Sequence, residues 1–131
     1  MREIASGVPA DVFAGTDAVH GDFHPGNVLV AAGSPDVVAG VVDWTGARAG
    51  DCGLDLVTLG FSLDHDVAAP AARVLVRDRI AADVDSHALL AFTAHLALRQ
   101  VDWAIRHHGT AEADRWADIA DDWFRWATRA S

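Results

Sequence analysis

The chain contains no lysine, so its ten basic residues are all arginine. Its single cysteine, Cys52, excludes an internal disulfide and suits a reducing compartment. No stretch approaches the roughly 18 uninterrupted apolar residues of a membrane span, and the N-terminal sequence MREIASGVPADVFAG lacks the features of a secretory signal. We therefore expect a soluble cytoplasmic protein of one domain with no membrane partner.

Positive charge is scarce as well, because the chain has 19 acidic and 10 basic residues and a formal net charge of −9. Binding to nucleic-acid backbones requires clustered positive charge, so we expect no nucleic-acid partner. An acidic chain could attract a cationic substrate. Base composition of a GC-rich genome explains the same excess of Ala, Asp and Arg, and we prefer that explanation.

Two runs rich in β-branched residues flank a short turn-forming cluster. Residues 27–32 read NVLVAA, residues 33–36 read GSPD and residues 37–44 read VVAGVVDW. This pattern predicts a β-hairpin. Because its two backbones lie about 4.8 Å apart, such a hairpin returns Asp43 to the end that Asn27 leaves.

Three oxygen-bearing side chains are thereby expected at one end of this hairpin. Asn27 and Asp43 could share one magnesium ion, which prefers oxygen ligands and takes few of them from protein. Asp22 precedes Asn27 on a segment that glycine and proline keep out of regular helix or strand. It is therefore free to face a substrate.

The same residues fit a kinase catalytic loop, in which His20, Gly21 and Asp22 are followed at a fixed distance by Asn27, with Gly where protein kinases have Arg. The segments HGDFHPGN and VVDWTGARAGDCGLDL resemble those of the aminoglycoside phosphotransferase and choline kinase-like family. This resemblance covers residues 19–59. It implies an α+β fold like the C-terminal lobe of a protein kinase, mostly helical, with a β-hairpin carrying the catalytic and metal-binding loops.

The resemblance also implies an activity, the ATP-dependent transfer of a phosphoryl group to a hydroxyl of a small molecule. In that template Asp22 is the catalytic base, and Asn27 and Asp43 bind Mg²⁺. Aminoglycoside-like sugars, amino alcohols and hydroxyl-bearing amino acids are all compatible acceptors.

Supporting roles follow from the same resemblance. His20 is expected to brace the loop and Asp51 to tie the following turn to it, while His24 is a possible pocket residue. Asp51 or Asp55 could alternatively begin the next helix. Trp44 stands where protein kinases have the Phe of their DFG motif, and Thr45 and Gly46 depart from the residues expected there, so the turn geometry is left open.

No residue of this sequence matches the groups that hold ATP in the kinase template. There is no lysine, no GxGxxG and no Walker-type motif, and a nucleotide-binding lobe cannot fit before His20. We therefore expect residues 1–131 to form a C-terminal catalytic lobe alone, from a truncated frame, a gene fragment or a split protein. Such a chain should transfer phosphate slowly or not at all, and should self-associate or bind the missing lobe.

Four helices are expected after the hairpin. Their predicted ranges are 51–63, weakened by Gly60; 68–84, with Pro70 in its first turn; 86–108, capped by Asp85 or Ser86 and closed by Gly109; and 111–130. The third has an apolar stripe through Leu89, Phe92, Leu96 and Trp103, widened by Leu98, Val101 and Ile105. The fourth places Trp116, Ile119, Ala120, Trp123 and Ala127 on one side.

Two other functions stay open. His20, Asp22 and His24 alternate, so on a strand they could bind a transition metal together with Asp43, as in a metal-dependent hydrolase. The chain could instead be a non-catalytic helical fragment or interaction module. Tight binding of a transition metal would favour the hydrolase, whereas weak magnesium binding would favour the phosphotransferase.

Overall fold

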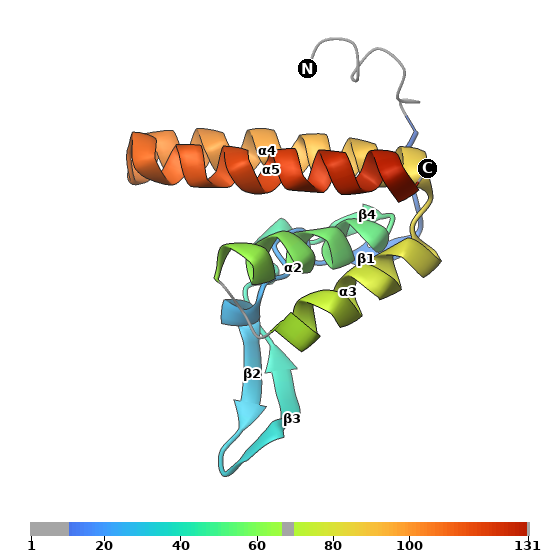
Figure 1. Cartoon of the computed structure of the whole chain (residues 1–131). Coiled ribbons are helices and arrows are strands. Elements are labelled where there is room, and N and C mark those ends of the chain that lie inside the picture. Colours follow the sequence, from blue (N-terminus) through green and yellow to red (C-terminus); the bar gives the residue numbers. More distant parts are fainter. Residues whose placement is uncertain (1–10, 67–69, 131) are drawn as a thin grey trace.

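A computed structural model describes residues 11–66 and 70–130 and shows an α+β chain dominated by helices (Figure 1). The described strands form two antiparallel pairs, β1 (Asp17–Val19) with β4 (Arg48–Gly50) and β2 (Val28–Ala31) with β3 (Ser34–Val41). Two single 3₁₀ turns are η1 (Pro25–Asn27) and η2 (Trp44–Gly46). The α-helices are α2 (Gly53–His65), α3 (Pro70–Asp83), α4 (Ser86–His107) and α5 (Thr110–Ala130).

Strands β2 and β3 confirm the predicted hairpin, which projects away from the helices (Figure 1). Its turn is tighter than expected, because Ala31 pairs with Ser34 and only two residues connect the strands. Gly33 supplies the positive φ of 75° that this turn needs. At the other end the Val42 N–H donates to the Asn27 carbonyl at 2.9 Å, so the chain does return to where Asn27 left it.

The β1–β4 pair is a contact that the sequence pattern did not predict. It joins Asp17 to Gly50 and Val19 to Arg48. β1 leads into the loop of residues 20–27, which carries Asp22 and Asn27, and β4 follows the η2 turn next to Asp43. The hydrogen-bonded pair therefore fixes the start of this loop and the end of this turn next to each other.

The helix predictions are confirmed within a few residues, although residues 67–69 lie outside the described part of the chain. Asp85 is the N-cap of α4, and Gly109 follows its end with φ 93°. Hydrogen bonds from the Ala88 and His87 backbone N–H groups lower the pKa of the Asp85 carboxyl. No helix in the described ranges combines the length and apolar character that a membrane crossing requires.

The core lies where α4 and α5, running side by side, pack against α2 (Figure 1). Leu89, Phe92 and Leu96 of the predicted α4 stripe are buried, and so are Trp116 and Trp123 of α5. Leu98, Trp103 and Ile105 were predicted wrongly, because they are exposed, whereas Val101 is partly buried against the core. Leu98 and Ile105 lie on the side of α4 that faces away from Leu89. In Figure 1 the paired helices extend beyond the end of α2, which leaves the C-terminal part of α4, where Trp103 lies, without α2 to cover it.

Gly60 has a packing role that helix propensity does not reveal. A Cβ at this position would lie 2.4 Å from Cη2 of Trp123, which is fully buried. The absence of a side chain therefore lets α2 approach the indole of α5 closely.

We predict that Gly60→Ala destabilises the fold, although alanine has the higher helix propensity by about 1 kcal/mol. Overpacking against an immobile indole should cost about 1–3 kcal/mol and outweigh that gain. Urea unfolding measures the difference, with Gly40→Ala as control because a Cβ there meets nothing within 4 Å. Equal or higher stability of Gly60→Ala would show that the indole can move aside.

Candidate active site

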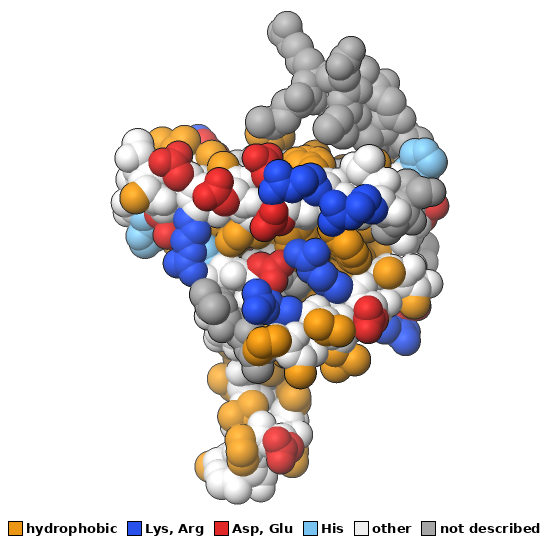
Figure 2. Space-filling view, viewed as in Figure 1, with side chains coloured by type: hydrophobic (Ala, Val, Ile, Leu, Met, Phe, Trp, Pro, Cys, Tyr) orange, Lys and Arg blue, Asp and Glu red, His pale blue; other side chains and the backbone are white. Residues whose placement is uncertain are grey.

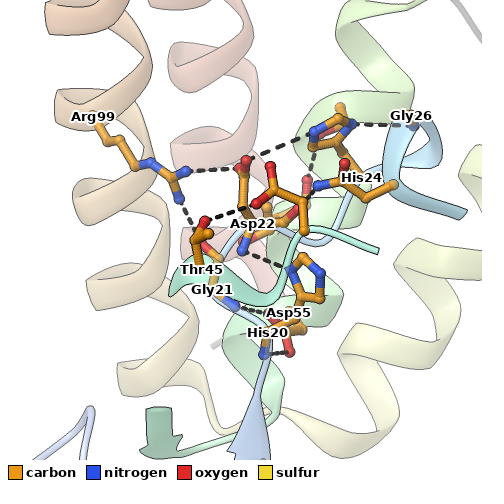
Figure 3. A network of polar contacts seen from close by, with 12 residues as sticks. His20, Gly21, Asp22, His24, Gly26, Thr45, Asp55 and Arg99 are labelled. Carbon is orange, nitrogen blue, oxygen red and sulfur yellow. Dashed lines mark hydrogen bonds and ion pairs between the residues drawn. The ribbon is translucent and has the colours of Figure 1, made fainter. Parts of the chain in front are cut away.

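The buried ring of His20 joins the loop of Asp22 to the turn of Asp43 (Figure 3). Its Nδ1 accepts the Asp22 backbone N–H at 3.2 Å. A backbone N–H can only donate, so Nε2 carries the ring proton and donates to the Val42 carbonyl at 2.8 Å. The Trp44 ring lies 4.7 Å from the imidazole. His20 thus contacts the residues on both sides of Asp43.

Asn27 adds one hydrogen bond within the loop and one between the loop and the segment before Asp43. Its side-chain Nδ2 donates to the Asp22 carbonyl at 3.0 Å, and its own carbonyl accepts from the Val42 N–H. Since the amide nitrogen is directed to the loop, the amide oxygen lies on the other side of the group. That oxygen is the atom able to bind a cation.

Asp43 has a left-handed backbone, with φ 61° and ψ 58°. It is the single non-glycine residue with positive φ in the described ranges, and this conformation costs about 1–2 kcal/mol. The Thr45 hydroxyl donates to Asp43 Oδ1 at 2.7 Å, which orients the carboxylate. Strain of this kind concentrates at functional sites, so the conformation supports a role for Asp43.

The glycine that replaces the usual kinase arginine has a steric reason. Gly21 has φ 82°, and a Cβ there would lie 2.7 Å from the Gly46 carbonyl oxygen. The loop and the η2 turn therefore pack backbone to backbone. Gly46 has no comparable steric reason, because a Cβ there would make only ordinary contact with the His20 carbonyl oxygen, at 3.4 Å.

Asp55 supports the loop in the way expected of Asp51. Its carboxylate accepts the His20 N–H at 2.7 Å and the Gly21 N–H at 2.9 Å (Figure 3). Asp51 instead accepts the Gly53 N–H at 2.7 Å, where α2 begins. From the sequence, Asp55 was expected only as an acidic residue at the start of α2, where it would interact with the helix dipole.

Arg99 of α4 is a site residue that the sequence analysis missed. Its Nη1 donates to the Gly21 carbonyl at 2.6 Å and its Nη2 to Asp22 Oδ1 at 2.7 Å (Figure 3). A signal did exist, because Arg99 is a cation on the predicted apolar stripe, three residues after Leu96 and seven after Phe92. A charged group on such a face needs a partner.

His24 lies beside the second carboxylate oxygen of Asp22. Its Nδ1 accepts the Gly26 N–H at 3.1 Å, and its Nε2 is 3.7 Å from Asp22 Oδ2. Both residues line a cavity of about 830 Å³ that continues along α4 to the start of α5. Its volume suits a small-molecule ligand. His24 thus lines the cavity, and its role as a pocket residue stays a prediction.

A second acidic group lies at the end of the β1–β4 pair where β1 begins and β4 ends. Ligand atoms of Asp17, Asp51 and Cys52 lie within 4.8 Å of one another. A hydrogen bond with Asp17 raises the pKa of the Cys52 thiol, and burial and the nearby carboxylates raise it further. Metal binding needs the thiolate, so this group is a poor site for a soft metal.

The geometry does not support the hydrolase alternative. Nε2 of His20 carries the ring proton and the Nδ1 lone pair accepts the Asp22 N–H, so in this arrangement neither nitrogen is open to a transition metal. Among the described residues, the group of His, Cys, Asp or Glu ligand atoms close enough to share an ion is Asp17, Asp51 and Cys52, which includes none of His20, Asp22, His24 and Asp43. β1 also ends at Val19, so these residues do not share a strand.

Comparison with known proteins gave one family. A family model described as the phosphotransferase enzyme family matches residues 16–90, more than half of the 131 residues. Searches of curated proteins and of solved structures gave no match. The matched range includes the loop, the hairpin and α2, whereas Arg99 lies beyond it.

We predict that Gly21→Ala loosens the site more than Gly33→Ala does. Both glycines have positive φ, but a Cβ at Gly33 meets nothing within 4 Å. The control should therefore cost only the conformational penalty of about 1–2 kcal/mol. Gly21→Ala should cost more, because Gly46 must also move. Equal losses in urea unfolding would refute the close packing of loop and turn.

We also predict that Asp55→Ala costs about 2–4 kcal/mol of unfolding free energy, because it removes two charge-assisted hydrogen bonds and leaves two N–H groups unpaired. Asp51→Ala, the control, loses one bond at a helix start and should cost about 1 kcal/mol. Amide hydrogen exchange at His20 and Gly21 should accelerate in the first variant alone. A larger loss for Asp51→Ala would contradict the supporting role of Asp55.

Proposed function

We propose that this chain, which belongs to the phosphotransferase enzyme family, takes part in the transfer of a phosphoryl group from ATP to a hydroxyl group of a small molecule. The observation that supports this most is the hydrogen-bonded unit around His20. It joins the backbones of Asp22 and the Asp43 turn, with Asn27 bonded to both segments.

Asp22 is the proposed base. Arg99 holds its Oδ1, which leaves Oδ2 on the side of His24 and the cavity. A hydroxyl in that cavity can give its proton to Oδ2 as its oxygen attacks the γ-phosphorus of ATP, the bond from that phosphorus to the β,γ-bridging oxygen breaks, and ADP leaves with the electron pair. Arg99 is then a positioning residue, because its two contacts fix the carboxylate and the loop backbone together.

Asn27 and Asp43 are the proposed Mg²⁺ ligands. A carboxylate and an amide oxygen form a donor set that suits this ion, and few protein ligands leave room for phosphates and water. When bound, magnesium would neutralise charge on the transferred phosphate. Thr45 fixes Asp43 Oδ1 for this purpose.

The assignment of these residues to one lobe of a kinase-like enzyme rests on the family match. These residues would supply the base, the metal ligands and the acceptor cavity, as the C-terminal lobe of a kinase-like fold does. No residue is assigned to the lysine that pairs with ATP phosphates in the kinase template, because the sequence has none. A cytoplasmic location suits an ATP-dependent enzyme and stays a prediction.

We predict that Mn²⁺, used as a paramagnetic substitute for Mg²⁺, broadens the backbone amide signals of Asn27, Asp43 and Thr45 in NMR spectra. Asp43→Asn should weaken this binding at least tenfold, about 1.4 kcal/mol, because it removes the charged ligand. Asparagine tolerates the left-handed backbone, so the fold should persist.

Asp51→Asn is the matched control and should leave the broadening at Asp43 unchanged. Broadening centred on Asp17 and Cys52, or broadening that Asp43→Asn does not reduce, would contradict the proposed metal site. An unchanged amide spectrum of both variants without Mn²⁺ verifies that neither has unfolded.

A further inference from the structure

Trp44 follows Asp43 directly, and burial in the core does not explain why a tryptophan stands there. Its side chain is 51% exposed, and its indole Nε1–H donates to the Val41 carbonyl at 2.8 Å in an exposed hydrogen bond. Water can satisfy a donor at the surface, so desolvation does not require this bond. Its effect is on the backbone that it spans.

The hydrogen bond from Trp44 spans the residue with the strained backbone. Its acceptor belongs to Val41, the last residue of β3, and its donor belongs to the residue after Asp43. The ring that it closes therefore contains the φ of 61° and the ψ of 58° of Asp43. Because rotation about either bond moves the indole relative to the Val41 carbonyl, the contact favours the left-handed conformation.

His20 holds the next carbonyl along the chain. Its Nε2 donates to the Val42 carbonyl at 2.8 Å, so two side-chain donors hold the consecutive carbonyls of Val41 and Val42. The rings of His20 and Trp44 are also in contact, with centroids 4.7 Å apart and planes tilted by 57°. A left-handed backbone at a residue other than glycine persists only where several contacts determine it. These contacts meet that requirement at Asp43.

Resting on the proposed function, we propose that Trp44 is a positioning residue for the metal site. Its indole N–H holds Asp43 in the left-handed conformation and thereby fixes the carboxylate that binds Mg²⁺. Thr45 orients one oxygen of this carboxylate, but that contact lies inside the turn and does not join the turn to β3. Trp44 supplies this connection. Loss of its N–H frees the Asp43 backbone and leaves the fold intact.

The ¹⁵N-labelled 131-residue chain without metal provides the first test. The Trp44 indole N–H should exchange with water more slowly than that of Trp103, which is 46% exposed and makes no hydrogen bond through its indole within the described residues. Asp43 should show a strong nuclear Overhauser effect between its amide and α protons, because a positive φ brings these protons close together. Trp44→Phe should weaken this effect, since it removes the donor and keeps an aromatic ring beside His20.

Trp103→Phe is the matched control, because it also replaces a half-exposed tryptophan. Both variants should lose a similar small part of their resistance to urea, whereas Trp44→Phe alone should change the Asp43 signals. Trp44→Phe should also weaken Mn²⁺ binding at Asn27 and Asp43 about fivefold, the equivalent of one hydrogen bond. A role in stability alone would lower the urea midpoint of Trp44→Phe and leave its Mn²⁺ affinity unchanged.

Failure of this proposal is distinguishable from failure of the proposed function. The proposal is overturned if the Trp44 indole exchanges as fast as that of Trp103, or if the Asp43 effect persists in Trp44→Phe. If Mn²⁺ binds equally well at Asn27 and Asp43 with and without the substitution, the positioning role is wrong and the phosphotransferase assignment stands. If Trp44→Phe alters the Asp43 backbone but the unmodified chain binds no Mn²⁺ there, Trp44 positions Asp43 and the proposed function is wrong.

Discussion

The imidazole of His20 is the contact on which the geometry of the site depends. It is 2% exposed and bonded through both nitrogens, once to the loop that carries Asp22 and once to the carbonyl before Asp43. A buried polar group costs free energy unless its hydrogen-bonding capacity is used, so the ring is stable only while loop and turn hold their places. The unusual backbones of Gly21 and Asp43 lie on either side of this contact and are maintained by it.

The helices contribute to the site through polar contacts that join distant parts of the chain. Asp55 of α2 accepts from two loop N–H groups, and Arg99 of α4 binds both the Gly21 carbonyl and the Asp22 carboxylate. The exposed half of α4 then forms the wall of the cavity next to Asp22. Packing of α2, α4 and α5 in one shared core therefore determines where the proposed base and acceptor meet (Figures 1 and 3). The face of the helices seen in Figure 2 carries a mixture of arginine and acidic side chains. Arg77 lies over the rings of Trp123 and Trp126, at 4.7 and 4.9 Å from their centroids.

Local patterns predicted the hairpin, the four helices and the cap at Asp85, because β-branched runs, helical spacing and cap residues act over a few positions. They did not predict the β1–β4 pair or the Arg99–Asp22 contact, whose partners are 29 or more and 77 residues apart. The sequence pattern also could not distinguish Asp51 from Asp55, because both lie at the start of α2. Only the fold shows that Asp55 contacts the loop and that Asp51 contacts the first turn of the helix. Trp103 was assigned to the core because helical periodicity identifies a face but does not show where the covering helix ends.

A crystal structure of the chain grown with Mn²⁺, phased or checked by the anomalous signal of the metal, tests the central claim most directly. The account predicts one anomalous peak between the side-chain oxygens of Asn27 and Asp43, with the carboxylate of Asp22 on the cavity side of it. A metal bound only by Asp17 and Asp51, or carboxylates of Asp22 and Asp43 directed to opposite sides of the molecule, would contradict it.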